Sequence, residues 1–349
     1  MTALARDAAS IPASAGLSKA AARDARIDIA RGIGMVLVVW GHALYGVMNA
    51  GHDTQIHRFE LLSIYTTHMA LFFILAGLLA GSIRKRSWSE FWSMAFTRVI
   101  WPYLLWSVLL KTIHFAMSGY VNTPLKGYAV LDILWKPPSV MWFLYALLLG
   151  MILLKLTSAF SRPATVALAA VLFASGYLLP DLDPQMDWIR TSLRFIAIYL
   201  VAAMVGRAGF ERLLAPVWVA LATGVMGVTL AYAWVDAAEP IPGYAAFAPL
   251  YIPALLAGPV VAMRLAYAIG ATRGGGALGA ALALVGRNTM PIFVTHILFT
   301  AGVRIVMLEL GLTNASLIIA LATIIGVIAP LVAAMLADRL RVAAYLGWR

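Results

Sequence analysis

The chain has 349 residues, of which 62% are hydrophobic and only 12% charged, and its mean hydropathy is +0.88. A soluble domain carries about twice that charged fraction, so the composition excludes a soluble globular protein and predicts an all-α, polytopic membrane bundle. The net charge of +11 fits the basic loops of membrane proteins better than a nucleic-acid partner, and the lack of cysteine excludes disulfides and thiolate chemistry.

The first 26 residues lack an apolar segment followed by a cleavage site. We therefore expect residues 1–26 to form a disordered cytoplasmic tail and not a signal peptide. Residues 27–349 are expected to form one domain of about ten membrane-spanning helices. The predicted cores are 29–49, 61–83, 97–117, 140–157, 164–180, 193–207, 214–235, 246–270, 289–308 and 314–337. The core 246–270 contains three prolines, which predict a kink or a break.

Basic residues predict the orientation of these helices. Most of the 26 Lys and Arg residues fall in the N-terminal tail, in alternate loops and at the C-terminus. The positive-inside rule then places both termini in the cytoplasm and gives an even number of spans. The Gly-rich run from Arg273 is expected to be a loop between the eighth and ninth spans. It lacks the Lys-Ser/Thr ending of a phosphate-binding loop, which disfavours a nucleotide site.

The first predicted helix carries Asp28, Arg31 and His42, and ionisable groups in a membrane helix mark a functional site by default. Arg31 and His42 are eleven residues apart, which places them on one face of the helix, about 16 Å apart along its axis. The simpler interpretation is an arginine at the lipid headgroups and a histidine bonded to a neighbouring helix. The shared face, with Asp28 three residues before Arg31, favours a site.

Histidines on other helices predict where chemistry takes place. With the topology above, His68 lies at the same depth as His42, in the outer half of the bundle. His42, His68, His114 and His296 fall on four helices with no carboxylate inside a span, so a metal site is not expected. A histidine acting as a general base remains, because it removes a proton from a hydroxyl near neutral pH.

Three further cations, Lys111, Arg194 and Arg304, make the outer half of the bundle basic. They either extend to the membrane interface or line an outward vestibule that suits an anionic or polyhydroxylated ligand. Trp142 begins the fourth helix and belongs either to an interfacial aromatic belt or to a sugar-stacking surface. Arg98, near the inner end of the third helix, could clamp phosphates together with Arg31.

Several of these segments resemble the membrane acyltransferase 3 family, and the first is similar to its fucose 4-O-acetylase-like branch. Arg31 and His42 match the family's Arg-x10-His motif. The similar blocks, in chain order, are Asp28-Ile-Ala-Arg-Gly-Ile-Gly with Val38-Val-Trp-Gly-His, His68-Met-Ala-Leu-Phe-Phe-Ile-Leu-Ala-Gly, Arg98-Val-Ile-Trp-Pro-Tyr, Trp142-Phe-Leu and Asn288-Thr-Met-Pro-Ile-Phe-Val-Thr-His. The second block departs from the family pattern, with Ala76 before Gly77 where Ser-Gly is usual.

The resemblance implies a ten-helix inner-membrane enzyme that transfers an acyl group, usually acetyl, from cytoplasmic acyl-CoA to a carbohydrate or lipid-linked glycan. Acceptors in the family include fucose in surface polysaccharides and nodulation-type glycolipids. It implies that Arg31 and His42 are the essential pair and that Arg98 corresponds to a family arginine. No permanently bound cofactor is implied. No hydrolase domain of the SGNH type follows the helices, so a second transfer step is not expected.

We therefore predict a membrane O-acyltransferase with Arg31 and His42 as catalytic residues. His42 acts as a general base or as a transient acyl carrier. The residues expected to bind acyl-CoA or the acceptor are Asp28, His68, Arg98, Lys111, Trp142, Arg194, His296 and Arg304. The alternative is a carrier or exporter of an anionic solute without acyl transfer, although no internal repeat typical of such folds is visible.

Overall fold

A computed structural model describes residues 24–122, 124–125, 127–180, 186–238, 248–271 and 276–348. Every regular element in these ranges is helical, which confirms the predicted all-α bundle. The helices are α1 (Ala25–Met48), α2 (Gln55–Tyr65), α3 (His68–Leu78), α4 (Trp88–Ala95), α5 (Trp101–Ala116), α6 (Trp142–Leu156), α7 (Arg162–Leu178), α8 (Trp188–Arg212), α9 (Pro216–Asp236), α10 (Ile252–Ala271), α11 (Gly276–Arg287), α12 (Thr289–Glu309) and α13 (Ala315–Arg339). The tail predicted over 1–26 lies almost wholly outside the described residues.

Within the described residues, nine helical segments are long and apolar enough to cross a membrane. The chain is therefore a multi-pass membrane protein. Each predicted core overlaps one of these segments except 164–180, which corresponds to the shorter helix α7. The cytoplasmic position of both termini stays a prediction.

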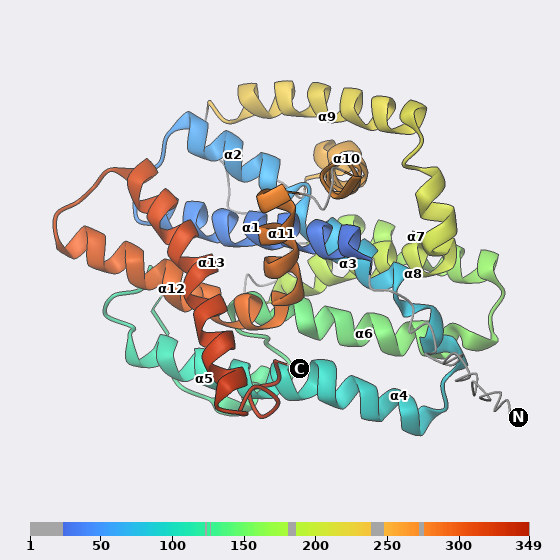
Figure 1. Cartoon of the computed structure of the whole chain (residues 1–349), viewed down its shortest axis with the longest axis horizontal. Coiled ribbons are helices and arrows are strands. Elements are labelled where there is room, and N and C mark those ends of the chain that lie inside the picture. The colour runs from blue at the N-terminus through green and yellow to red at the C-terminus, as the bar shows by residue number, and fades with distance from the viewer. Residues whose placement is uncertain are drawn as a thin grey trace, which may run out of the picture.

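The prediction missed helix α11. The last residue of the Gly-rich run, Gly276, begins this 12-residue helix, which is built mainly from Gly, Ala and Leu. It is too short to cross a membrane as a straight helix. Figure 1 shows α11 crossing α1 steeply and not running parallel to it.

The boundaries of two predicted helices were wrong. The span predicted over 97–117 begins at Trp88, because Ser87 and Glu90 form a capping box that starts α4 well before the apolar core. The span predicted over 61–83 extends from Gln55 to Leu78 and is divided by a break after Tyr65. In both cases polar residues outside the apolar window continue the helix.

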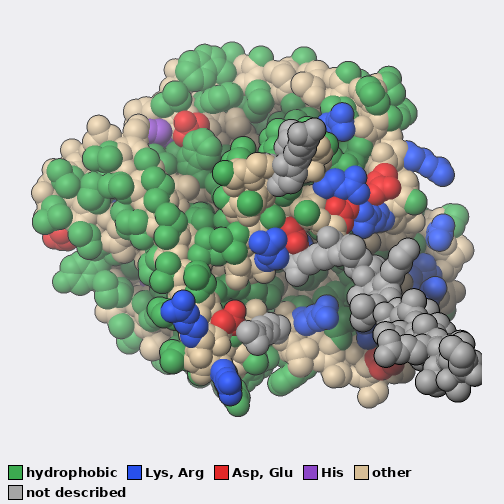
Figure 2. Space-filling view, viewed as in Figure 1, with side chains coloured by type: hydrophobic (Ala, Val, Ile, Leu, Met, Phe, Trp, Pro, Cys, Tyr) green, Lys and Arg blue, Asp and Glu red, His purple; other side chains and the backbone are tan. Residues whose placement is uncertain are grey.

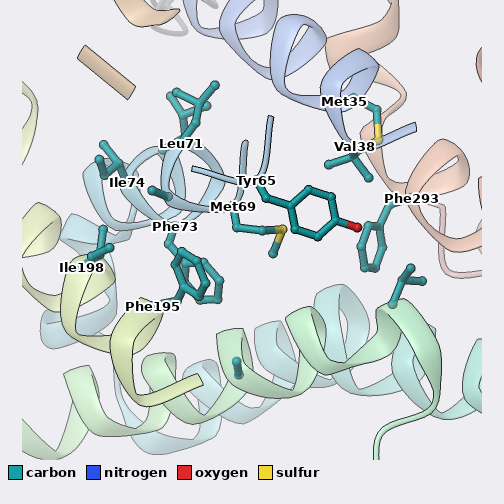
Figure 3. Close-up of a cluster of buried hydrophobic side chains, with 14 of the residues drawn as sticks. Met35, Val38, Tyr65, Met69, Leu71, Phe73, Ile74, Phe195, Ile198 and Phe293 are labelled. Carbon is teal, nitrogen blue, oxygen red and sulfur yellow. The ribbon is translucent and has the colours of Figure 1, made fainter. Parts of the chain in front are cut away.

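Helix α1 is the centre of the bundle. It contacts α2, α3, α10, α11, α12 and α13, and Figure 1 shows it between α9 on one edge of the molecule and the α4–α5 helix on the other. Beside α3, an aromatic group joins α6 and α8, with Phe73 stacked on Phe195 at 5.3 Å between ring centres (Figure 3). A residue of α1 is thus positioned by several helices at once.

Charged side chains gather toward the beginning of α1 on the face shown in Figure 2, whereas the opposite end of that face is mainly hydrophobic. The Asp24 side chain accepts from the backbone N–H of Arg26 at the start of α1 and is ion-paired with the side chains of Arg26 and Arg207. Arg207 also pairs with Glu211 at 3.1 Å. The hydrogen bond from Arg26 holds the pKa of the Asp24 carboxyl below its usual value. These pairs connect the N-terminal end of α1 to the C-terminal end of α8.

Candidate active site

Reciprocal glycine contacts fix the inner half of α1. A Cβ added to Gly32 would lie 2.0 Å from the carbonyl oxygen of Leu282, and one added to Gly286 would lie 1.8 Å from that of Asp28. Only glycine allows two helix backbones to approach so closely. Because α12 follows α11 directly, this crossing sets where α12 begins relative to α1.

Asp28 and Arg31 lie beside this crossing. Asp28 is buried, at 3% exposure, and its carboxylate is 4.0 Å from the guanidinium of Arg31, whose side chain remains partly exposed. Asp28 therefore lies beside Arg31 and can orient its guanidinium. Both residues lie in the first two turns of α1, well before His42.

Four aromatic side chains meet in the middle of the bundle, and we call them the histidine cluster: His42 of α1, Tyr65 of α2, His68 of α3 and His296 of α12. The ring centre of His42 is 5.2 Å from that of His296 and 6.3 Å from that of Tyr65. Tyr65 is in turn 4.9 Å from His68. His42 and His68 were expected at one depth, and the structure places Tyr65 against both.

The break between α2 and α3 creates this arrangement. Thr66 and Thr67 separate the two helices, and Thr67 packs so tightly on α10 that a Cβ added to Gly258 would lie 2.5 Å from its hydroxyl oxygen. Pro259 follows Gly258 inside α10, where a proline removes a helical hydrogen bond. Figure 3 shows the Tyr65 ring reaching from the break toward α1 and α12.

The hydrogen bonds of the two inner histidines determine their tautomers. His68 Nδ1 lies 2.8 Å from the carbonyl oxygen of Ile64. His296 Nδ1 lies 3.0 and 2.7 Å from the carbonyl oxygens of Ile292 and Phe293. A carbonyl oxygen only accepts, so each Nδ1 carries the hydrogen, and in the neutral ring each Nε2 is an acceptor. His68 and His296 are 2% and 0% exposed, whereas His42 is partly exposed.

The cluster contains side chains that can transfer protons. Its most accessible member, His42, is an imidazole, whose ring nitrogens can both accept and donate a proton. Among the described residues there is no group of three or more His, Cys, Asp and Glu side chains that could hold a metal ion. Sequence reasoning missed Tyr65. Its only sequence signal is its place three residues before His68 in the run Ile64-Tyr-Thr-Thr-His.

Arg304 of α12 lies against Gly46, which is one turn beyond His42 on α1. Its Nε would be 3.5 Å from a Cβ at Gly46, and one of its amino groups donates to the side-chain oxygen of Asn122 at 2.8 Å. Asn122 in turn donates to the carbonyl oxygen of Gly46 at 2.9 Å. Arg304 is 7% exposed, and no described carboxylate forms an ion pair with it. An incompletely neutralised buried guanidinium attracts anionic ligands.

The other two predicted outer cations have protein partners away from the cluster. Lys111 donates to the carbonyl oxygen of Ala129 and lies 3.3 Å from a carboxylate oxygen of Asp132. Arg194 lies over the ring of Tyr177 at 4.8 Å, between α8 and α7. None of these partners is Arg304 or a residue of the histidine cluster.

Trp142 packs in the aromatic group and not in an outer belt. Its ring is stacked on Phe73 at 6.5 Å and tilted against Phe195 at 5.8 Å, and both partners are fully buried. The next residue, Phe143, contacts Phe293 at 5.3 Å between ring centres. Trp142 thus supports the wall of the histidine cluster through its neighbours.

Arg98 was expected at the start of a helix, and the structure places it inside a continuous one. It lies in a π-helical turn, Phe96–Ile100, between α4 and α5, and such turns are frequent at functional sites. Its exposed side chain lines an open groove of about 450 Å³ on one side of this helix, which we call the arginine groove. The lining residues are Arg86, Ser89, Glu90, Ser93, Met94, Thr97 and Arg98.

A comparison with family models matches residues 24–336 to the acyltransferase 3 model, which is described as an acyltransferase domain. The match begins just before α1 and ends within α13, so it includes the histidine cluster and the arginine groove.

Two curated relatives are nodulation proteins designated NolL. The one from Mesorhizobium japonicum is 28% identical over 158 residues, which cover 44% of this chain and 41% of the relative. The one from Sinorhizobium fredii is 32% identical over 140 residues, which cover 40% of this chain and 38% of the relative. The matched segments thus span about two fifths of each relative's length. No solved structure is significantly similar to this chain.

Proposed function

The chain belongs to the acyltransferase 3 family, and from this premise we propose that it is a membrane O-acyltransferase that transfers acetyl from acetyl-CoA to a carbohydrate hydroxyl. The observation that carries the proposal is the histidine cluster. It presents the partly exposed His42 beside His296, with Tyr65 between His42 and His68. An accessible imidazole backed by buried polar groups is suited to general-base or nucleophilic catalysis.

The donor binds through its phosphates to arginines. Arg98 is exposed at the arginine groove, where serine and threonine hydroxyls are also available. Arg31 presents a half-buried guanidinium on the face of α1 that leads toward His42. Arginine forms bidentate bonds with phosphate oxygens, so each residue can anchor part of acyl-CoA. We place this end of the protein in the cytoplasm, because most basic loop residues belong to it.

The transfer takes place at His42 by one of two routes. In direct transfer His42 removes the proton from the acceptor hydroxyl, and the oxygen attacks the thioester carbon. In the relay route His42 first takes the acetyl group and then passes it to the hydroxyl. Both routes use the axial separation of Arg31 and His42, about 16 Å, to join a phosphate anchor to a reacting centre.

The acceptor binds near Arg304. This buried cation lies one turn beyond His42 and has only an amide oxygen as a described side-chain partner. It favours an acceptor that carries a phosphate or carboxylate group. The acceptors named for the family and the designation of both relatives as nodulation proteins favour a lipid-linked glycan of the bacterial inner membrane.

The test is acetyl transfer by the purified full chain in detergent. Labelled acetyl-CoA is mixed with a glycolipid extract from membranes of the source strain, and both lipid-bound label and free CoA are measured. The chain contains no cysteine, so a thiol reagent detects released CoA without background from the protein. Label transfer with an equal amount of free CoA supports the enzyme. Solute uptake into proteoliposomes without any CoA release would replace it with the carrier alternative.

A further inference from the structure

His296 combines a bonded ring nitrogen with an unbonded one inside the histidine cluster. Its Nδ1 faces two carbonyl oxygens of its own helix, at 3.0 and 2.7 Å, and so carries the ring hydrogen. The opposite nitrogen, Nε2, is fully buried and has no hydrogen-bond partner among the described residues. A buried acceptor without a partner is unfavourable and calls for an explanation.

The ring of His42, which can donate a hydrogen bond through a ring N–H, lies beside the ring of His296. The two ring centres are 5.2 Å apart, and the planes are tilted by 46°. Because Nδ1 is turned back to α12, Nε2 lies on the ring edge away from its own backbone. The rings are not hydrogen-bonded in this structure, and catalytic hydrogen bonds often shorten only when substrate is bound.

Packing holds the backbone beside both rings. Gly326 of α13 lies between α1 and α12, where an added Cβ would be 2.7 Å from Val39 and 2.8 Å from Thr300. Val39 precedes His42 by three residues, and Thr300 follows His296 by four. The two helices therefore cannot separate here without disrupting a tight three-helix contact, and the side chain of His42 is partly exposed beside it.

We propose that His296 is a positioning residue whose Nε2 accepts a hydrogen bond from a ring N–H of His42. This bond selects one tautomer of His42 and leaves its other nitrogen with a lone pair for the acceptor hydroxyl. The inference rests on the proposed acyl transfer and deepens it, because it assigns a partner to the base. The same division of roles occurs where a buried group orients a catalytic histidine.

The proton balance of the direct route follows from this assignment. The acceptor O–H bond breaks and its proton moves to the free nitrogen of His42. The acceptor oxygen forms a bond to the thioester carbon, the C–S bond breaks, and the thiolate of CoA takes the proton from His42. His296 stays neutral throughout, because it accepts one hydrogen bond and stabilises the transient imidazolium.

Two substitutions separate the acceptor role from a purely structural one. His296→Gln places an amide oxygen near the position of Nε2, whereas His296→Asn keeps a donor near the position of Nδ1 but does not reach His42. We expect kcat for CoA release, with acetyl-CoA and the source glycolipid extract, to fall about 100-fold in His296→Asn. His296→Gln is expected to retain most of the activity, and KM for acetyl-CoA is expected to change in neither variant.

A matched control is His57→Gln. His57 is also buried and also has one buried ring nitrogen, Nδ1, without a partner among the described residues, but it lies outside the histidine cluster, with its Nε2 3.2 Å from the hydroxyl of Ser316. It should retain wild-type kcat, and thermal unfolding in detergent identifies any variant that fails to fold. Activity of His296→Asn equal to or above that of His296→Gln would overturn the positioning role while leaving the transferase intact. Absence of CoA release by the wild-type chain would instead refute the proposed function itself.

Discussion

The histidine cluster and the arginine groove differ in their exposure to solvent. Three of the four side chains in the cluster are buried, and two of them bond to backbone carbonyl oxygens, His68 to Ile64 of α2 and His296 to Ile292 and Phe293 of its own helix. The arginine groove is open, and the side chain of Arg98 is exposed. A group that transfers protons benefits from a dry, rigid setting, whereas a group that captures a phosphate from water must be accessible.

The buried cations Lys111 and Arg304 differ in their partners. Lys111 has a carboxylate of Asp132 at 3.3 Å, so its charge is satisfied within the protein. Arg304 has the neutral amide oxygen of Asn122 instead. Both residues are buried and look equivalent in the sequence, but of the two only Lys111 has a carboxylate partner among the described residues. The charge of the side-chain partner, and not the degree of burial, therefore distinguishes a structural cation from a candidate binding cation.

The largest expected effect is on the cluster. His42→Ala removes the group that accepts the hydroxyl proton, and we expect kcat for acetyl transfer to fall at least about 1000-fold. The protein should still fold, because His42 is only partly buried. The measurement is label transfer to the glycolipid extract, with the unfolding temperature as a control. Activity near the wild-type level would remove His42 from the mechanism.

The next effect concerns the crossing that positions the cluster. Gly286→Ala would place a methyl group against the carbonyl oxygen of Asp28, and we expect a loss of about 1 to 3 kcal/mol of stability. Gly227→Ala is the matched control, because nothing lies within 4 Å of its added Cβ. That substitution should be neutral or stabilising. Equal unfolding temperatures for the two variants would contradict the tight α1–α11 contact.

A smaller effect is expected at the arginine groove. Arg98→Ala should raise KM for acetyl-CoA about 10-fold and leave kcat nearly unchanged, because it removes one phosphate contact of about 1.4 kcal/mol. Added salt should weaken acetyl-CoA binding less in this variant than in the wild type. Arg162→Ala, an exposed arginine at the start of α7, serves as the control. An unchanged KM would exclude Arg98 as a donor anchor.

The smallest effect is on the ion pairs at the start of α1. Arg26 holds the pKa of Asp24 below its usual value of 3.8. A carboxyl whose pKa is lower in the folded state contributes stability above its unfolded pKa, and this contribution is lost as the pH falls through the folded value.

Asp24→Asn should therefore lower the free energy of unfolding at pH 7 by less than about 1 kcal/mol, which is seen as a slightly lower unfolding temperature. The difference from wild type should shrink as the pH falls through the lowered pKa of Asp24 and vanish once the Asp24 carboxyl of the folded wild type is also protonated. Glu309→Gln, at an exposed carboxylate without an ion pair among the described residues, is the control. A difference that persists at low pH would show that the effect does not come from the charge of Asp24.

The sequence by itself determined the membrane class, the helical architecture and the shared face of Arg31 and His42. These properties depend on composition and on a periodicity that is local along the chain. It also indicated His68 and His296, because ionisable residues stand out in apolar segments. It did not reveal α11, since a short run of Gly and Ala has neither the length nor the hydrophobic pattern of a span.

Only the tertiary structure decided which of these residues meet. The place of Tyr65 against both His42 and His68, the approach of His296 to His42 and the pairing of Lys111 with Asp132 depend on the rotation and depth of each helix. One residue of register turns a side chain by about 100°, which composition and periodicity do not specify. Close contacts at Gly32, Gly286 and Gly326 set that rotation, because backbones that nearly touch fit in one arrangement.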